Sequence, residues 1–159
     1  MNVGAPKTAF TNRVIMCGDS GSTRLFKDGL GAAYTMGKAA AKTAVFHGVG
    51  KEHFQEDYYP AYRELIVDNR FGKYLFAVTD LIKTSSMMTK GMLAVVNDEQ
   101  QDAEAPKTLS SILWDMFTGN ERYKNIFLRT LDIKVHFALL VKFAKVIAGR
   151  HDSTSRRNL

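Results

Sequence analysis

The feature of this sequence that most constrains its fold is a short apolar segment, Val14–Cys17, which stops at Gly18-Asp19. Four apolar residues, two of them β-branched, that end at a glycine predict a buried β-strand. A buried strand needs neighbouring strands, because its backbone donors and acceptors must be paired. The rest of the chain offers few candidates, so we expect one strand in an otherwise helical protein, with its pairing left open.

A loop and then a helix are predicted to follow this strand. The loop covers Ser20–Asp28, and Gly29-Leu30-Gly31 opens a segment rich in small residues that continues over Ala32–Val45. Alanine has the highest helix propensity of all residues. The first fifty residues are therefore predicted to form a strand–loop–helix unit.

The spacing of apolar residues predicts helices along most of the remaining chain. An acidic segment without large apolar residues, Asn97–Pro106, predicts a solvated linker or loop. Thr118-Gly119-Asn120 predicts a turn. The helices expected on either side of these segments cover 65–83, 85–96, 109–117 and 127–147.

The expected fold class is therefore mostly α with an N-terminal strand–loop–helix unit. The length of 159 residues suits one compact domain. We expect three regions along the chain: 1–50 with the strand, the loop and the first helix, 51–150 as a helical region, and 151–159 as a flexible tail.

The net charge of +6 is unevenly distributed. Residues 1–50 carry +4, residues 51–104 carry −4 and residues 105–159 carry +6. The positive charge of the last third suits anionic lipid better than nucleic acid, because no nucleic-acid-binding module is recognisable. We therefore expect no nucleic-acid partner.

The stretch Phe127–Ile147 is strongly apolar and carries Lys134, Lys142 and Lys145 on one side of the predicted helix. A basic amphipathic helix of this kind can lie in a membrane interface. It can equally dock on the core of its own protein, with the lysine stems covering apolar surface at the rim. Both interpretations stay open, and a membrane surface is one expected partner of residues 127–147.

The beginning of the sequence does not resemble a secretion signal. Gly4, Pro6 and Lys7 stand where a signal peptide would need an apolar run, and no stretch of 18 apolar residues predicts a transmembrane helix. The single cysteine, Cys17, excludes a disulfide within the chain and a multi-cysteine zinc site. These features predict a cytoplasmic protein. The basic helix suggests a membrane-peripheral location as the alternative.

The segment between Gly18 and Gly31 has the clearest chemical potential. Asp19 offers a carboxylate just past the carboxyl end of the predicted strand, which is the edge at which open α/β sheets bind ligands. The backbone N–H groups at a helix start carry partial positive charge, and glycines there allow a ligand oxygen to approach closely. Asp19 is suited to accept hydrogen bonds from sugar-like hydroxyl groups.

This order of strand, Gly-Asp, nine-residue spacer, Gly-x-Gly and small-residue helix resembles the second FAD-binding motif of the p-hydroxybenzoate-hydroxylase and geranylgeranyl-reductase superfamily of flavoproteins. In that family the aspartate holds the ribityl chain of FAD, and the Gly-x-Gly faces the pyrophosphate and the pyrimidine side of the flavin. The resemblance implies FAD as the cofactor and assigns cofactor-binding roles to Gly18, Asp19, Asp28, Gly29, Leu30 and Gly31.

The resemblance further implies an FAD-dependent oxidoreductase, similar to the monooxygenases and geranylgeranyl reductases of that family, acting on a lipid-like substrate. The family's first motif, G-x-G-x-x-G, is not found in this sequence. The chain is therefore expected to be the C-terminal part of an α/β FAD-binding fold followed by helices. The N-terminal dinucleotide-binding part would belong to the full-length protein or to a partner subunit, and this fragment alone would be inactive. No catalytic acid or base is assigned.

Two other functions stay open. Gly18-Asp19-Ser20 after a strand also resembles the first block of GDSL-type esterases, with Ser20 as the nucleophile. That family places Asp-x-x-His near its C-terminus, whereas Asp132 and His136 lie one residue further apart here, and His151-Asp152 falls in the polar tail. The other alternative is a non-catalytic helical module that binds a partner or a membrane surface.

The remaining residues with chemical potential have simpler interpretations. His47 and His53 lie near acidic residues, yet their spacing does not suit a helical metal-ligand pair, so no metal site is predicted. Cys17 is expected to be a small core residue. Aromatic residues in the helical region, among them Tyr58, Tyr59 and Tyr62, are expected to form core, with the lining of a substrate channel as the alternative.

Overall fold

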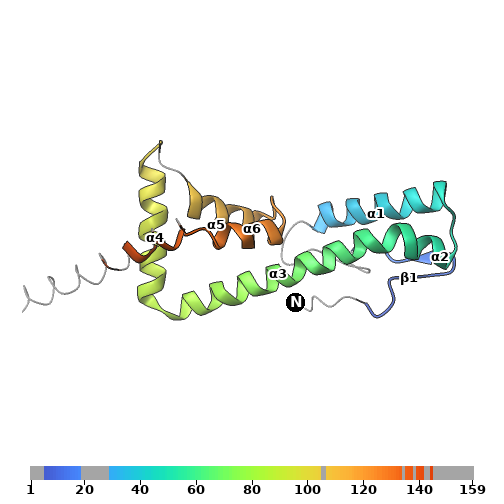
Figure 1. Ribbon diagram of the computed structural model, residues 1–159, viewed down its shortest axis with the longest axis horizontal. Coiled ribbons are helices and arrows are strands. Elements are labelled where there is room, and N and C mark those ends of the chain that lie inside the picture. Colours follow the sequence, from blue (N-terminus) through green and yellow to red (C-terminus); the bar gives the residue numbers. More distant parts are fainter. Residues whose placement is uncertain are drawn as a thin grey trace, which may run out of the picture.

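The computed structural model describes residues 6–18, 29–104, 107–133, 135–137, 139–141 and 144. These residues are mostly helical, with a small two-stranded sheet near the N-terminus, which confirms the predicted mostly-α class. Figure 1 shows α3 as the long central element, with α1 beside one half of it and α5 and α6 beside the other. In chain order the elements are β1 Phe10–Thr11, β2 Val14–Ile15, α1 Gly29–Phe46, α2 Lys51–His53, the π-helix η2 Phe54–Tyr58, α3 Tyr59–Thr84, α4 Ser86–Gln101, α5 Thr108–Thr118 and α6 Tyr123–Thr130.

The predicted strand Val14–Cys17 is part of a small hairpin and is shorter and less buried than expected. β2 pairs antiparallel with β1, so that Phe10 lies opposite Ile15 and Thr11 opposite Val14. Arg13 adopts a left-handed φ of 60° in the two-residue turn, which lets the chain reverse immediately. Val14 is 55% exposed, so the prediction of a fully buried strand was wrong.

The helices α2, η2 and α3 follow one another without interruption from Lys51 to Thr84. Pro60 lies in the first turn of α3 and has no N–H to donate to the preceding turn. The π-helical turn lies directly before it, where a local change of hydrogen-bond pattern is tolerated. As a result Phe54, Tyr58 and Tyr62 are all buried against α1 and the hairpin.

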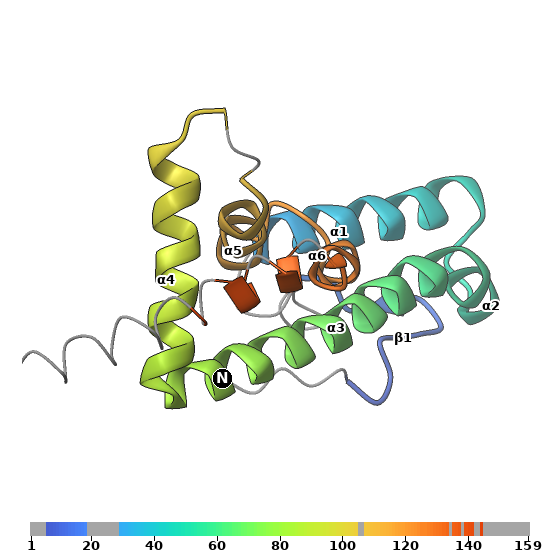
Figure 2. The same ribbon diagram turned by 60° about the vertical axis from the view of Figure 1, so that its left-hand side comes forward.

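The apolar side chains form two separate cores along α3. The N-terminal core joins the hairpin, α1, η2 and the start of α3, and the C-terminal core joins the end of α3 with α4, α5, α6 and the following turn (Figures 1 and 2). The N-terminal core consists of Ala9, Phe10, Met36, Ala40, Phe54, Tyr58 and Tyr62. The C-terminal core consists of Leu75, Val95, Leu109, Ile112, Met116, Tyr123, Ile126 and Val135.

Two carboxylates from distant helices hold the N-termini of α5 and α6. The N-cap residues Lys107 and Arg122 make no side-chain capping bond themselves. Instead Glu99 accepts hydrogen bonds from the backbone N–H of Leu109 at 2.9 Å and of Ser110 at 2.7 Å. These bonds satisfy backbone donors that a helix start leaves unpaired, and the negative charge suits the positive end of the helix.

Asp68 caps the N-terminus of α6, as Glu99 caps that of α5. This buried residue of α3 accepts the backbone N–H of Tyr123 at 3.1 Å and that of Lys124 at 2.9 Å. The bonds tie the middle of α3 to the start of α6 across more than fifty residues of sequence. They fix the position of α6 against α3 as well as satisfying its N-terminus.

The prediction of a solvated linker over Asn97–Pro106 was therefore partly wrong. α4 continues to Gln101, and the acidic Glu99 on it caps α5 rather than facing solvent alone. Ala105 and Pro106 lie outside the described residues. The predicted turn after α5 is confirmed, because Gly119 ends that helix with a left-handed φ of 76°.

The predicted helix over 127–147 is also corrected, because it is not continuous in the described residues. α6 ends at Thr130, and tight backbone bonds from Leu131 to Leu128 and from Asp132 to Arg129 close its last turn. A new helical turn starts after Asp132, whose carbonyl accepts the N–H of Val135 at 3.0 Å. Lys134, Lys142 and Lys145, and the tail 151–159, lie outside the described residues.

An ion pair joins α5 to α6 inside the C-terminal half. The Asp115 carboxylate lies 2.5 Å from the Arg129 guanidinium and accepts a hydrogen bond from Asn120 at 3.1 Å. The same guanidinium donates to the Ser111 hydroxyl at 2.7 Å. The hydrogen bond from Arg129 lowers the pKa of Asp115, against the opposing effect of its burial.

This ion pair predicts a loss of stability in acid. A lowered carboxyl pKa stabilises the fold at neutral pH, and that contribution disappears as the pH falls from the ordinary carboxyl value near 4 through the lowered value. Melting temperatures measured from pH 7 to pH 2 should therefore fall more steeply for the parent chain than for Asp115→Asn. Asp80→Asn, which alters an exposed pair with Lys83, is the control and should follow the parent curve. Parallel curves for the parent and Asp115→Asn would contradict the prediction.

Candidate functional site

The candidate site begins where β2 leads into Gly18. The Met16 N–H donates to the Ala9 carbonyl at 2.9 Å, and the Met16 carbonyl accepts the Tyr58 hydroxyl at 2.9 Å. These two bonds fix the chain just before Gly18. Gly18 has a left-handed φ of 66°, which favours glycine because a side chain would be strained there.

Gly18 lies next to the beginning of α1. A Cβ built on Gly18 would come within 3.8 Å of the Ala33 Cβ, which is an ordinary contact. The requirement for glycine therefore comes from the backbone conformation rather than from lack of space. The structure thus brings the end of the hairpin to the first turns of α1, as the strand–loop–helix prediction required.

The described part of α1 starts at Gly29, and the residues directly before it lie outside the described residues. Its first turn contains no acidic residue, and Leu30 is 89% exposed. Of the predicted cofactor-binding residues, Gly18, Gly29, Leu30 and Gly31 are described, whereas Asp19 and Asp28 lie outside the described residues.

A group of aromatic side chains packs behind Gly18. Tyr58 is fully buried, and its ring stacks on that of Tyr62 with centroids 6.0 Å apart. Burial, followed by the charges of nearby Cys17 and Tyr62, raises the pKa of Tyr58 to about 12, so this phenol stays protonated at neutral pH. Burial also raises the pKa of the Cys17 thiol, which packs against the same core as predicted.

Tyr62 is the residue whose importance sequence reasoning missed. Its side chain is only 4% exposed, and its hydroxyl is buried without a hydrogen-bond partner in the described part of the chain. Buried hydroxyl groups nearly always have a partner, because an unpaired one destabilises the folded state. The sequence indicated only an aromatic helix, since nothing in it distinguishes Tyr62 from its neighbours Tyr58 and Tyr59.

These described residues suit part of a flavin nucleotide. A flavin with its ribityl chain offers carbonyl and hydroxyl oxygens to its protein. Among the described residues the chain offers a left-handed glycine, Gly18, beside the N-terminal part of α1. The sheet that surrounds such a site in an α/β FAD-binding fold is not part of the described structure.

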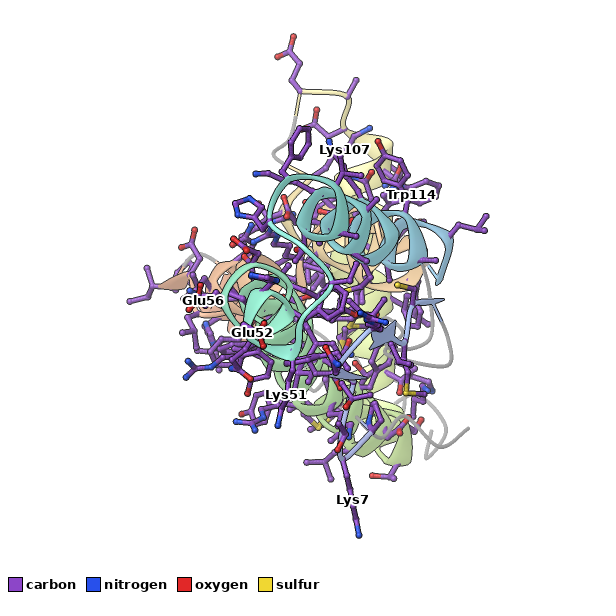
Figure 3. All side chains as sticks on the ribbon, turned by 90° about the vertical axis from the view of Figure 1, so that its right-hand side faces the viewer. Lys7, Lys51, Glu52, Glu56, Lys107 and Trp114 are labelled. Carbon is purple, nitrogen blue, oxygen red and sulfur yellow. The ribbon has the colours of Figure 1, made fainter. Side chains whose placement is uncertain are left out.

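Two of the histidines make local contacts around α2. The His53 ring accepts the Gly50 N–H at 3.3 Å, and His47 lies 3.4 Å from the Asp57 carboxylate. Figure 3 shows Glu52 and Glu56 on the outside of the molecule at this end. In the described residues no group of three or more such side chains is arranged to hold a metal ion.

The residues of the esterase alternative give little further support. Ser20 and His151 lie outside the described residues. The His136 ring nitrogen Nδ1 lies 3.1 Å from the main-chain oxygen of Asp132, rather than pairing with a carboxylate in that contact. The esterase function stays an untested alternative.

In the described residues that follow α6, some apolar side chains pack on the C-terminal core and others are exposed. Val135 is buried in the C-terminal core and Leu139 packs against it, so the docking alternative holds for these two residues. Ile133, Phe137 and Leu140, spaced at four and three residues, are 80%, 68% and 66% exposed.

No helix in the part of the chain that the structure describes is long and apolar enough to cross a membrane. Contact with a membrane surface stays a prediction for this segment.

The chain was also compared with known proteins. None of the protein-family models, curated proteins or solved structures matches it.

Proposed function

We propose that the chain contributes the ribityl and flavin side of an FAD site in an FAD-dependent oxidoreductase. The observation that carries the proposal is the left-handed Gly18 beside Ala33 of α1, a helix whose described part starts with Gly29-Leu30-Gly31. This is the local arrangement that a Gly-Asp turn followed by a Gly-x-Gly helix start requires.

In this proposal Asp19 accepts hydrogen bonds from the ribityl hydroxyls, as the resemblance to the flavoprotein motif implies. The backbone at Gly29–Gly31 stabilises negative charge near the pyrimidine side of the flavin, because the start of a helix carries partial positive charge. The bound flavin supplies the redox chemistry, and the chain binds and orients it. The resemblance to the flavoprotein family implies that the oxidoreductase acts on a lipid-like substrate.

The rest of the cofactor would be held by a dinucleotide-binding part, in the same protein or in a partner subunit. The outer face of α1 is suited to contact that part, because Leu30, Tyr34 and Val45 are exposed there. A Cβ added to Gly37 on this helix would meet no atom within 4 Å in the described structure. β2 would pair with the edge of the sheet in the dinucleotide-binding part. That part would then cover the exposed side chain of Val14.

The proposal predicts that the purified chain binds FAD and that Asp19→Ala weakens this binding about 10- to 100-fold, the effect of losing hydrogen bonds to a charged group. Quenching of flavin fluorescence during titration with FAD measures the dissociation constant. Asp80→Ala, at an exposed position on α3, is the matched control and should bind like the parent chain. An Asp19→Ala variant that binds FAD as tightly as the parent would contradict the role given to Asp19, and a parent chain that takes up no FAD would contradict binding by this chain without the dinucleotide-binding part.

A further inference from the structure

One side of α3 is lined by exposed side chains at helical spacing. They follow one another at intervals of three or four residues, and they are Arg63, Val67, Arg70, Tyr74, Val78 and Leu81. Such intervals place side chains on one face of a helix. The apolar spacing of α3 therefore continues onto a face that the described part of the chain leaves exposed.

The helix α6 widens this face on one side. The rings of Tyr74 and Phe127 meet edge to face with their centroids 5.5 Å apart, so the two helices adjoin there. Lys124, Leu128 and Leu131 are exposed on α6 and at its end, at intervals of four and three residues. Leu128 and Leu131, like Tyr74, are more than half exposed. These three residues and the six of α3 form what we call the α3–α6 face.

The charges on the α3–α6 face are all positive. Arg63, Arg70 and Lys124 form no ion pair with other described residues. The acidic residues of α3 are each engaged elsewhere, Glu64 with Arg122, Asp68 with the start of α6 and Asp80 with Lys83. α6 itself contains no acidic residue. The face therefore carries three positive charges that the described structure does not balance.

Charge and apolar area lie towards different ends of this face. The two helices run in the same direction here, because Gly72 lies against the Tyr123 ring and Tyr74 against the Phe127 ring (Figure 1). The three basic residues lie in the earlier turns of the two helices, whereas the apolar side chains that are more than half exposed lie in the later ones. The face thus changes from basic to apolar along its length.

We propose that the α3–α6 face binds the surface of an anionic lipid bilayer. Basic residues near such a surface are attracted to the negatively charged headgroups. Exposed apolar side chains of a helix gain by insertion at the boundary between the headgroups and the acyl chains. The bilayer therefore offers both contacts that the face requires, with the later turns of α3 and α6 inserted more deeply than the earlier ones. This inference goes beyond the proposed function and does not depend on FAD binding.

The electrostatic part is tested by co-sedimentation of the full chain with lipid vesicles. The parent should bind vesicles of phosphatidylcholine mixed with phosphatidylserine, should not bind phosphatidylcholine alone, and should be released by high salt. Replacing both Arg63 and Arg70 by glutamine should weaken binding about 10- to 30-fold, from the loss of two charges near the lipid. Lys42→Gln, which removes an exposed charge from α1, is the control and should bind like the parent.

The apolar part is tested by Leu81→Gln, since glutamine has a helix propensity close to that of leucine. Binding to the anionic vesicles should weaken about 5- to 10-fold, because the variant has less apolar area to bury. Leu93→Gln on α4 is the matched control, because Leu93 lies outside the face and is 62% exposed against 65% for Leu81. Both variants should melt like the parent, since both positions are exposed.

Four results would overturn the inference. The first is a parent chain that does not sediment with the phosphatidylserine vesicles. The second and third are an arginine double variant that binds as tightly as the parent, and equal effects of Leu81→Gln and Leu93→Gln. The fourth is a parent dimer, detected by light scattering, that Leu81→Gln dissociates, because the face would then bind a second copy of the chain. No result of the FAD titration affects this test, so the two proposals stand or fall separately.

Discussion

Replacing Asp68 by alanine is expected to lower the free energy of unfolding by about 2–4 kcal/mol, because the change leaves two backbone donors unpaired in a buried place. Asp68 lies in α3, is 7% exposed and accepts the N–H groups of Tyr123 and Lys124 at the start of α6. Its loss removes both the cap of α6 and the tie that holds this helix on α3. Urea unfolding followed by circular dichroism measures the change.

The control for this prediction is Asp80→Ala, which removes an exposed carboxylate from the same helix. Asp80 pairs with Lys83 on the surface at 2.9 Å, and such pairs contribute little. Its variant should stay within about 0.5 kcal/mol of the parent chain. Asp68→Asn should fall between the two, since an amide oxygen can accept one of the two bonds while its NH₂ group faces the other donor. An Asp68→Ala variant as stable as Asp80→Ala would contradict the role given to Asp68.

Replacing Gly72 by alanine is the second change with a large expected effect. A Cβ at this position would lie 2.7 Å from Cδ2 and 2.9 Å from Cε2 of Tyr123, whose side chain is fully buried. The ring cannot move away without disturbing the C-terminal core around it. We expect a loss of about 1–3 kcal/mol from overpacking, even though alanine favours a helix more than glycine by about 1 kcal/mol.

Gly37→Ala gives a matched comparison for Gly72→Ala, because both glycines lie within helices and receive the same methyl group. A Cβ at Gly37 would meet nothing within 4 Å in the described structure. This variant should therefore gain about 0.5–1 kcal/mol from helix propensity alone. Thermal unfolding of the two variants should shift in opposite directions. A gain in stability for both would mean that Tyr123 yields to the new methyl group and that α6 is held less tightly than described.

The parts of the fold that the sequence predicted well depend on local chemistry. Alanine-rich composition after a pair of glycines predicted α1, whose described part covers Gly29–Phe46. Apolar spacing predicted the existence of α3, α4 and α5, and Gly119 marked the end of α5. These signals lie within a few residues of the feature that they predict, so one sequence is enough to interpret them.

The parts that the sequence did not predict depend on contacts between distant residues. The acidic composition around Glu99 indicated a solvated linker, but the carboxylate caps a helix that begins nine residues later. Nothing in the sequence singled out Asp68, whose carboxylate the structure places at the start of α6. The hairpin was missed because Phe10-Thr11 is too short a run to stand out from its polar neighbours.

For the candidate site, the sequence predicted which backbone elements meet, but it did not indicate the unpaired buried hydroxyl of Tyr62 in the N-terminal core. Gly18 and the start of α1 come together as expected. The unpaired hydroxyl of Tyr62 is a property of packing, because whether a phenol finds a partner depends on every element around it. Periodicity indicates that such a residue is buried but carries no information about its hydrogen bonds.

The two separate cores along α3 also affect how the protein unfolds locally. Each core has its own helices, so amide hydrogen exchange should report two cooperative units rather than one. Amides of α1 would exchange with the N-terminal unit and those of α5 with the C-terminal one. A flavin bound at Gly18 would slow exchange in the N-terminal unit directly, and α3 is the element through which that protection would reach the other unit.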